Sequence, residues 1–259
     1  MQDNPYLAPA AEVSDPITEQ RADGTFLGTP QSRPAGAAVA WIGHSWRLFK
    51  ASPGMWIALT LVLMGGTIAL QAIPLIGGLL PGLLYPLLSA GLMFGCRDLE
   101  RGQALRFHHL FAAFGERLAP LLQFTVLYFV AYSAASAAVF IPLLGWDTYL
   151  RILSGDPGNI DLSAFWLAMA VNLVVSIPIL CAYWLALPLI ALNQASPLSA
   201  IRLSLVGCIK NLLPLILMML LFGLLMIAAV IPLGLGLFVV LPMLFSCMYT
   251  SYHGIFYRS

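Results

Sequence analysis

Six long apolar runs, free of Asp, Glu, Lys, Arg and His, dominate this chain of 259 residues. A hydrocarbon core about 30 Å thick needs roughly 20 apolar residues in each helix that crosses it. Only 9% of the residues are charged and the mean hydropathy is +0.90, whereas soluble domains carry about 25% charged residues. We therefore predict an all-α integral membrane protein with transmembrane helices at about 54–73, 78–96, 119–142, 164–191, 212–231 and 234–252.

An Ile-Pro-Leu phrase occurs three times, beginning at Ile73, Ile141 and Ile231. Upstream of each copy lies another proline preceded by a cation; these prolines are Pro53, Pro120 and Pro214. Self-similarity along a chain is the signature of a repeated structural unit. We expect three tandem helical hairpins, each built from two of the six spans.

An amphipathic segment precedes each hairpin, with apolar residues at helical spacing opposite polar ones. The apolar sets are Trp41, Ile42, Trp46 and Phe49; Phe107, Leu110, Phe111, Phe114 and Leu118; and Leu198, Ile201, Leu205 and Ile209. Ser196-Pro197 supplies a hydroxyl N-cap and a proline at the first helical position. We expect three interfacial helices in the headgroup region. Their candidate contacts to anionic headgroups are Arg47, Lys50, Arg106, Arg117, Arg202 and Lys210.

The placement of Lys and Arg predicts the orientation. In a six-span arrangement Arg151 is the one cation of the 12 that falls on the side opposite the rest. Positive charge marks cytoplasmic loops, so both termini should be cytoplasmic, in a multi-pass protein of a bacterial inner membrane. The membrane domain should span 38–259. Residues 1–37 are polar and Pro-rich, and we expect a disordered cytoplasmic tail there.

Polar side chains within the spans are uncharged, which argues against a proton-driven pump. Asn172 and Ser176 lie four residues apart on one helical face, and Gln123 lies in the third span. They indicate either an intramembrane polar patch facing a cavity or ordinary interhelical hydrogen bonds worth about 1 kcal/mol. Prolines at 86, 178, 188 and 242 either bend helices or open a binding site, as in some transporters.

Known catalytic and metal-binding patterns are missing from the sequence. The four His and four Cys residues show no ligand spacing, so we expect neither a metal nor another cofactor. Hydrolase and phosphate-loop motifs are likewise missing, and we expect no enzyme. A net charge of +1 argues against a nucleic-acid partner, which requires a basic face.

Several motifs in order resemble a proteobacterial inner-membrane family of unknown function, the BPSS-type multi-span family. The resemblance spans roughly 40–257. It is carried by Trp46-Arg47-Leu48-Phe49 with Pro53 and Trp56, Gly91-Leu92-Met93, Cys96-Arg97, Glu100-Arg101-Gly102, His109 to Phe114, Ser196-Pro197 to Lys210-Asn211, and Tyr249 to Phe256. It implies a six-span membrane protein and no particular activity.

Two functional classes remain open on the sequence. The first is a non-enzymatic module that organises lipids or a membrane protein partner, favoured by the three amphipathic segments and by the lack of charge within the spans. The second is a permease or carrier for a neutral or lipid-like molecule, favoured by the repeats and the intramembrane prolines.

Overall fold

The computed structural model describes residues 24–71, 73, 77, 79–115, 117–155, 158 and 160–258. Its elements are β1 (Thr25–Phe26), α1 (Ala37–Ala51), α2 (Pro53–Gln71), α3 (Leu79–Glu100), η2 (Phe107–Phe114), α4 (Leu118–Leu144), α5 (Trp146–Ser154), α6 (Leu162–Asn193), α7 (Pro197–Lys210), α8 (Leu212–Val230), α9 (Leu237–Phe256) and β2 (Tyr257–Arg258). The expected helical membrane protein is confirmed: α2, α4, α6, α8 and α9 are each long and apolar enough to cross a membrane.

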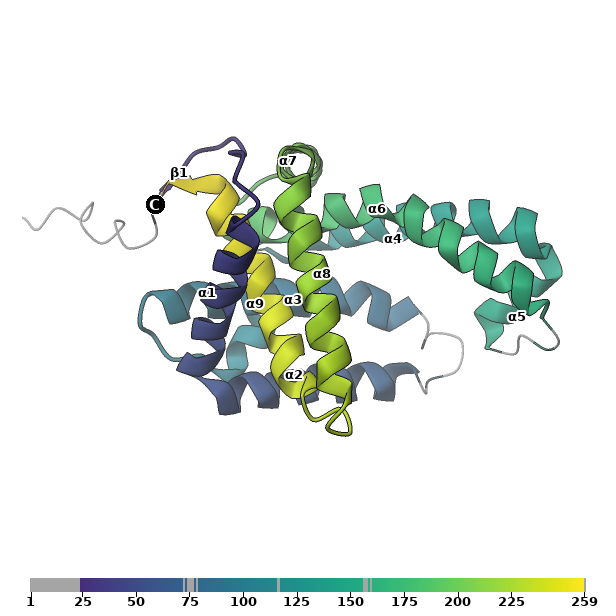
Figure 1. The fold of residues 1–259 in the computed structure, drawn as a ribbon, viewed down its shortest axis with the longest axis horizontal. Coiled ribbons are helices and arrows are strands. Elements are labelled where there is room, and N and C mark those ends of the chain that lie inside the picture. Colours follow the sequence, from purple (N-terminus) through teal and green to yellow (C-terminus); the bar gives the residue numbers. More distant parts are fainter. Residues whose placement is uncertain are drawn as a thin grey trace, which may run out of the picture.

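The sixth expected span, 78–96, falls in α3. This helix is not among the five, and it continues past the apolar run through Arg97, Asp98 and Glu100. Figure 1 shows α4 and α6 as a paired arm with α5 at its far end, and α2 and α3 running in the same general direction. In that view α8 and α9, together with α1, run across α2, α3, α4 and α6. The arrangement therefore does not confirm six parallel spans or three equivalent repeats.

Local sequence signals explain where α6 and α7 begin. The Asp161 carboxylate caps α6 by accepting hydrogen bonds from the N–H groups of Ser163 (2.9 Å) and Ala164 (3.3 Å). Helix α7 begins with Pro197 after Ser196, as expected, but the Ser196 hydroxyl bonds to the Ser199 hydroxyl at 2.9 Å and not to a backbone N–H.

Helix α1 packs against α9 and buries much of the apolar face that we expected in the headgroup region. Trp41, Leu48 and Phe49 are buried there, and Trp46 remains exposed. A Cβ atom at Gly254 would overlap the Trp41 indole, so glycine allows the close approach. Because protein covers this face, α1 is in large part a core helix.

We expected residues 1–37 to be a disordered tail, but residues 24–34, here called the strap, bond to distant parts of the chain. β1 pairs antiparallel with β2. The Arg33 guanidinium donates to the carbonyls of Gly254 (2.5 Å) and Tyr257 (2.9 Å). Asn211, fully buried, accepts from the Arg33 N–H and donates to the Gln31 carbonyl, both at 2.8 Å. The strap thus ties the end of α9 to the α7–α8 junction; residues 1–23 lie outside the described residues.

The second amphipathic segment forms a 3₁₀ helix, η2, over 107–114, and α4 begins at Leu118. Leu110 and Ala113 are buried against α3, whereas Phe107, Phe111 and Phe114 are exposed. Cβ atoms at Gly91 and Gly95 of α3 would overlap the His109 and Leu110 carbonyls and the Leu105 side chain, respectively. Two glycines one turn apart therefore let η2 lie directly on α3.

Candidate functional site

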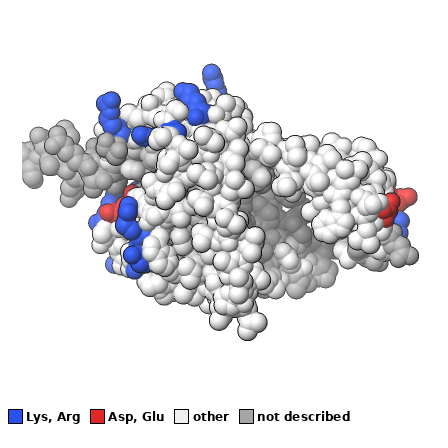
Figure 2. All heavy atoms as spheres, in the orientation of Figure 1, with Lys and Arg blue, Asp and Glu red and all other residues white. Residues whose placement is uncertain are grey.

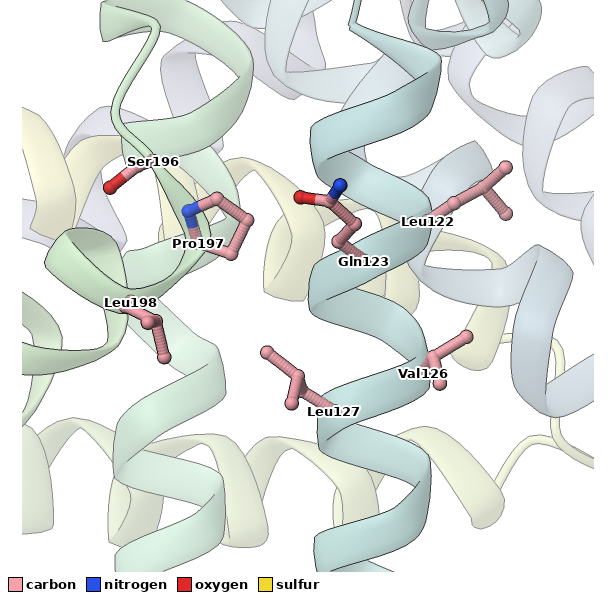
Figure 3. Close-up of a pocket in the computed structure, with 7 residues that line it drawn as sticks. All are labelled: Leu122, Gln123, Val126, Leu127, Ser196, Pro197 and Leu198. Carbon is pink, nitrogen blue, oxygen red and sulfur yellow. The ribbon is translucent and has the colours of Figure 1, made fainter.

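A hollow of about 710 Å³ opens between α4 and the start of α7. Figure 3 shows Gln123 and Leu127 pointing from α4 toward Pro197 and Leu198, while Leu122 and Val126 project from the other side of the helix. The lining is apolar apart from the Gln123 amide and the Ser196 hydroxyl. Leu198 is 72% exposed and Leu127 is 45% exposed, so protein atoms leave much of this lining uncovered.

A second hollow of about 350 Å³ continues from the first, because both include Leu127 and Leu198. It lies where α4, α6 and α7 meet. Its lining residues are Phe124, Leu127, Tyr128, Ala131, Pro178, Ile179, Ala182, Leu198, Ile201 and Leu205. Together the two hollows form one elongated depression, here called the groove, with α7 on one side and the α4–α6 pair on the other.

The amphipathic pattern of α7 explains its place beside the groove. Leu198, Ile201 and Leu205 lie at helical spacing and face the second hollow. Ser204, on another face, is buried: its hydroxyl donates to the Cys181 carbonyl (2.5 Å) and accepts from the Leu185 N–H (3.0 Å). The Ser204 hydroxyl thus fixes α7 on α6, so packed helices form both sides of the groove.

The expected polar patch is divided in the structure. Gln123 is exposed and lines the groove, whereas Asn172 and Ser176 are 8% and 4% exposed on α6 and line neither hollow. Asn172 Oδ1 and Ser176 Oγ have no hydrogen-bond partner in the described structure. Burying such atoms without a partner costs about 1–3 kcal/mol each. Asn172 and Ser176 therefore do not belong to the same site as Gln123.

The expected headgroup cations differ in their surroundings. Figure 2 shows Lys and Arg gathered at the end of the molecule that carries α1, α7 and the strap, where acidic side chains also lie, and both acidic and basic side chains at the α5 end. Arg47, Lys50, Arg106 and Arg202 are exposed, and Arg117 is half-buried at the start of α4. Lys50 lies 5.7 Å from the Trp46 ring centre. Lys210 donates to the Pro30 carbonyl at 3.3 Å, so it helps to hold the strap.

A partly buried polar network near the same end was missed on the sequence. Glu100 Oε1 lies 2.7 Å from His44 Nε2, and Oε2 accepts a 2.6 Å hydrogen bond from the Tyr249 hydroxyl. Burial raises the pKa of Glu100, but these two hydrogen bonds and the charge of His253 together hold that pKa below its usual value. The ionised carboxylate links α1, α3 and α9. No spacing rule connects these residues, because they come from three distant segments.

The described residues contain no group of three His, Cys, Asp or Glu side chains that could hold a metal ion. The groove presents no nucleophile beside a general base, since its polar groups are one amide, one serine hydroxyl and the Tyr128 phenol. Its chemistry is that of a binding surface: apolar over most of its length and hydrogen-bonding at one end. The apolar lining residues were missed on the sequence because they resemble any lipid-facing residue of a span.

Comparisons with known proteins agree with a membrane location. The chain is 26% identical over 187 residues to a protein of Burkholderia thailandensis named as a "probable inner membrane protein", covering 68% of each chain. No family model and no solved structure matches the chain. The similarity and the five apolar helices support an integral inner-membrane protein.

Proposed function

We propose that this protein is a non-enzymatic inner-membrane module that holds a phospholipid in the groove between α4, α6 and α7. The observation that carries the proposal is the continuity of two apolar hollows, of about 710 and 350 Å³. One end of the groove carries two polar side chains, Gln123 and Ser196, that can form hydrogen bonds to a ligand. Ligand pockets commonly measure about 300–1,000 Å³. One long acyl chain matches this elongated shape and apolar lining.

Charge near the groove supports a lipid with an anionic headgroup. Arg117 precedes the first turn of α4, and Arg202 follows Ile201 of the groove lining on α7. Near a membrane surface each cation contributes about 1 kcal/mol to the attraction of anionic lipid. The acyl chain would lie along Leu127 and Ile179, with the headgroup toward Ser196.

Native mass spectrometry of gently extracted protein tests the groove. We expect one phospholipid bound to each chain. Ala131→Trp places an indole in the second hollow and should reduce lipid binding at least about tenfold, which corresponds to about 1.4 kcal/mol. Val130→Trp adds the same side chain at a 59% exposed position of α4 that lines neither hollow and should leave binding unchanged. Equal losses in both variants would refute the groove as the binding site.

A six-span topology with both termini in the cytoplasm belongs to the same proposal. It takes α3 as the sixth span and places the chain in the BPSS-type family, whose motifs it resembles. We expect reporter fusions at the N-terminus, at Gly155 and at the C-terminus to report only Gly155 outside, because Arg151 alone among the cations lies in that loop. A reporter that places the N-terminus outside would contradict this topology.

A carrier for a neutral or lipid-like molecule is the second candidate. It is favoured by Pro178, which lines the groove and cannot donate a backbone hydrogen bond to the carbonyl one turn earlier in α6. Such a break can let helices shift around a substrate. Lipid that is bound once and exchanges slowly supports the module. Rapid movement of a labelled lipid between leaflets in proteoliposomes would support the carrier.

A further inference from the structure

A small polar pocket lies where α3 ends against η2. Its volume is about 270 Å³, and its lining residues are Asp98, Gln103, Ala104, Arg106, His108 and His109. None of them lines the groove. Unlike the groove, this pocket is surrounded mainly by side chains that can form hydrogen bonds, so it requires an explanation of its own.

The turn that ends α3 builds one wall of the pocket. Gly102 has φ +74°, a left-handed conformation that glycine adopts without steric cost. The N–H of Gly102 donates to the Leu99 carbonyl (3.1 Å) and that of Gln103 to the Asp98 carbonyl (2.8 Å). This pair of bonds is a Schellman motif, and it fixes the backbone of Gln103 against that of Asp98.

Buried His109 lines the pocket and pairs with the Asp98 carboxylate. The Arg106 N–H donates to His109 Nδ1 at 2.9 Å, and His109 Nε2 lies 2.9 Å from Asp98 Oδ2. A ring that accepts at Nδ1 carries its proton on Nε2, so it donates to Asp98. The other Asp98 oxygen lies 3.7 Å from Arg97 Nε. The negative charge of the pocket is therefore already partnered by protein groups.

The remaining polar groups of the pocket can donate hydrogen bonds to a ligand. The Arg106 side chain makes no ion pair with any described residue, and it is exposed, as are His108 and Gln103. A guanidinium forms two parallel hydrogen bonds to a phosphate, which makes arginine well suited to recognising it. A guanidinium, an imidazole and an amide around one small pocket favour an oxyanion.

An aromatic row beside the pocket points to the membrane surface. Phe107, Phe111 and Phe114 of η2 are exposed. Their successive ring centres lie 6.0 and 6.1 Å apart. In water this apolar row would be unfavourable, whereas it can insert among acyl chains at the interface. The pocket at the start of η2 would then lie at headgroup depth.

We propose that this pocket binds a phosphate group through Arg106, His108 and Gln103. Two sources share this chemistry: the headgroup of an anionic phospholipid and a soluble phosphate ester. Arg106 supplies the charge, while Asp98 and His109 hold the turn that presents it. The site is independent of the groove, because the two share no residue.

The test uses the full chain in phosphatidylcholine nanodiscs, with and without phosphatidic acid. Calorimetric titration with glycerol 3-phosphate probes the soluble source, and native mass spectrometry of retained phosphatidic acid probes the lipid. Arg106→Gln should weaken binding about tenfold, because it removes a charged donor and retains the backbone N–H that bonds to His109. His108→Gln should weaken it less. Arg258→Gln, the same charge change at an exposed residue of β2 that lines neither the pocket nor the groove, is the matched control.

Binding of glycerol 3-phosphate that Arg106→Gln weakens would support the site and identify a soluble ester as ligand. Extra phosphatidic acid retained by the wild type but not by Arg106→Gln would support it with a lipid ligand. Equal loss in Arg106→Gln and Arg258→Gln, or no binding of either probe, would overturn it. Lipid held in the groove should persist in Arg106→Gln, so the two sites can fail separately.

Discussion

Gly91→Ala is expected to destabilise the protein by about 3 kcal/mol or more, the upper part of the range for overpacked cores. A Cβ atom there would overlap the backbone carbonyls of His109 and Leu110. Backbone atoms cannot rotate away as a side chain can, so η2 would have to move off α3. Leu110, which is 1% exposed, would then lose its packing.

The midpoint of thermal unfolding in mild detergent measures this effect. A loss of about 3 kcal/mol corresponds to roughly 6–12 °C for a chain of this size class. Gly43→Ala is the control, since its Cβ has no atom within 4 Å, and alanine is favoured over glycine within helix α1 by up to about 1 kcal/mol. A midpoint for Gly91→Ala equal to that of Gly43→Ala would show that η2 does not lie on α3 as described.

Asn211→Leu is expected to release the strap while keeping a similar side-chain volume. The Asn211 amide makes three hydrogen bonds: it accepts from the Arg33 N–H and donates to the carbonyls of Gln31 (2.8 Å) and Gly207 (2.9 Å). Leucine leaves the Arg33 N–H and the Gln31 carbonyl without this partner, while the Gly207 carbonyl still accepts from the backbone N–H of position 211 at 3.1 Å. Each hydrogen bond lost at a part-buried group costs about 0.5–1.5 kcal/mol. The strap should therefore open far more often.

Limited proteolysis in detergent measures the opening of the strap, because cleavage follows the population of the open form when reclosing is fast. We expect cleavage within 24–34 to accelerate about 5- to 30-fold, the ratio that 1–2 kcal/mol produces. Ser32→Ala removes one exposed 3.3 Å bond to the Lys210 carbonyl and should change the rate little. An unchanged rate in Asn211→Leu would show that this amide does not hold the strap.

Local patterns predicted the helices well. The expected run 212–231 is α8 at Leu212–Val230, and Pro197 begins α7. Hydropathy and capping act over one helix, so a single sequence suffices to find them. The relative directions of the helices were not predictable in this way: the crossing of α8 and α9 over the other pairs in Figure 1 depends on side-chain packing between distant segments.

Contacts between distant segments account for what the sequence did not predict. The polar composition of 24–37 suggests disorder, but Arg33 bonds to residues more than 200 positions away. Likewise, the burial of Trp41 depends on Gly254. Of the candidate site, Gln123 was identified for its polarity, whereas Leu127 and Leu198 were not, because an apolar side chain facing a groove and one facing bulk lipid look alike in a sequence.

Photo-crosslinking in native membranes tests the groove most directly. Cells would incorporate a phospholipid with a diazirine on its acyl chain, and mass spectrometry would map the crosslinked residues after illumination. We predict crosslinks concentrated at Leu127, Ile179 and Leu198, and their loss in Ala131→Trp but not in Val130→Trp. Crosslinks spread evenly over the exposed faces of α2, α4, α6 and α8, and unchanged in Ala131→Trp, would contradict a lipid held in the groove.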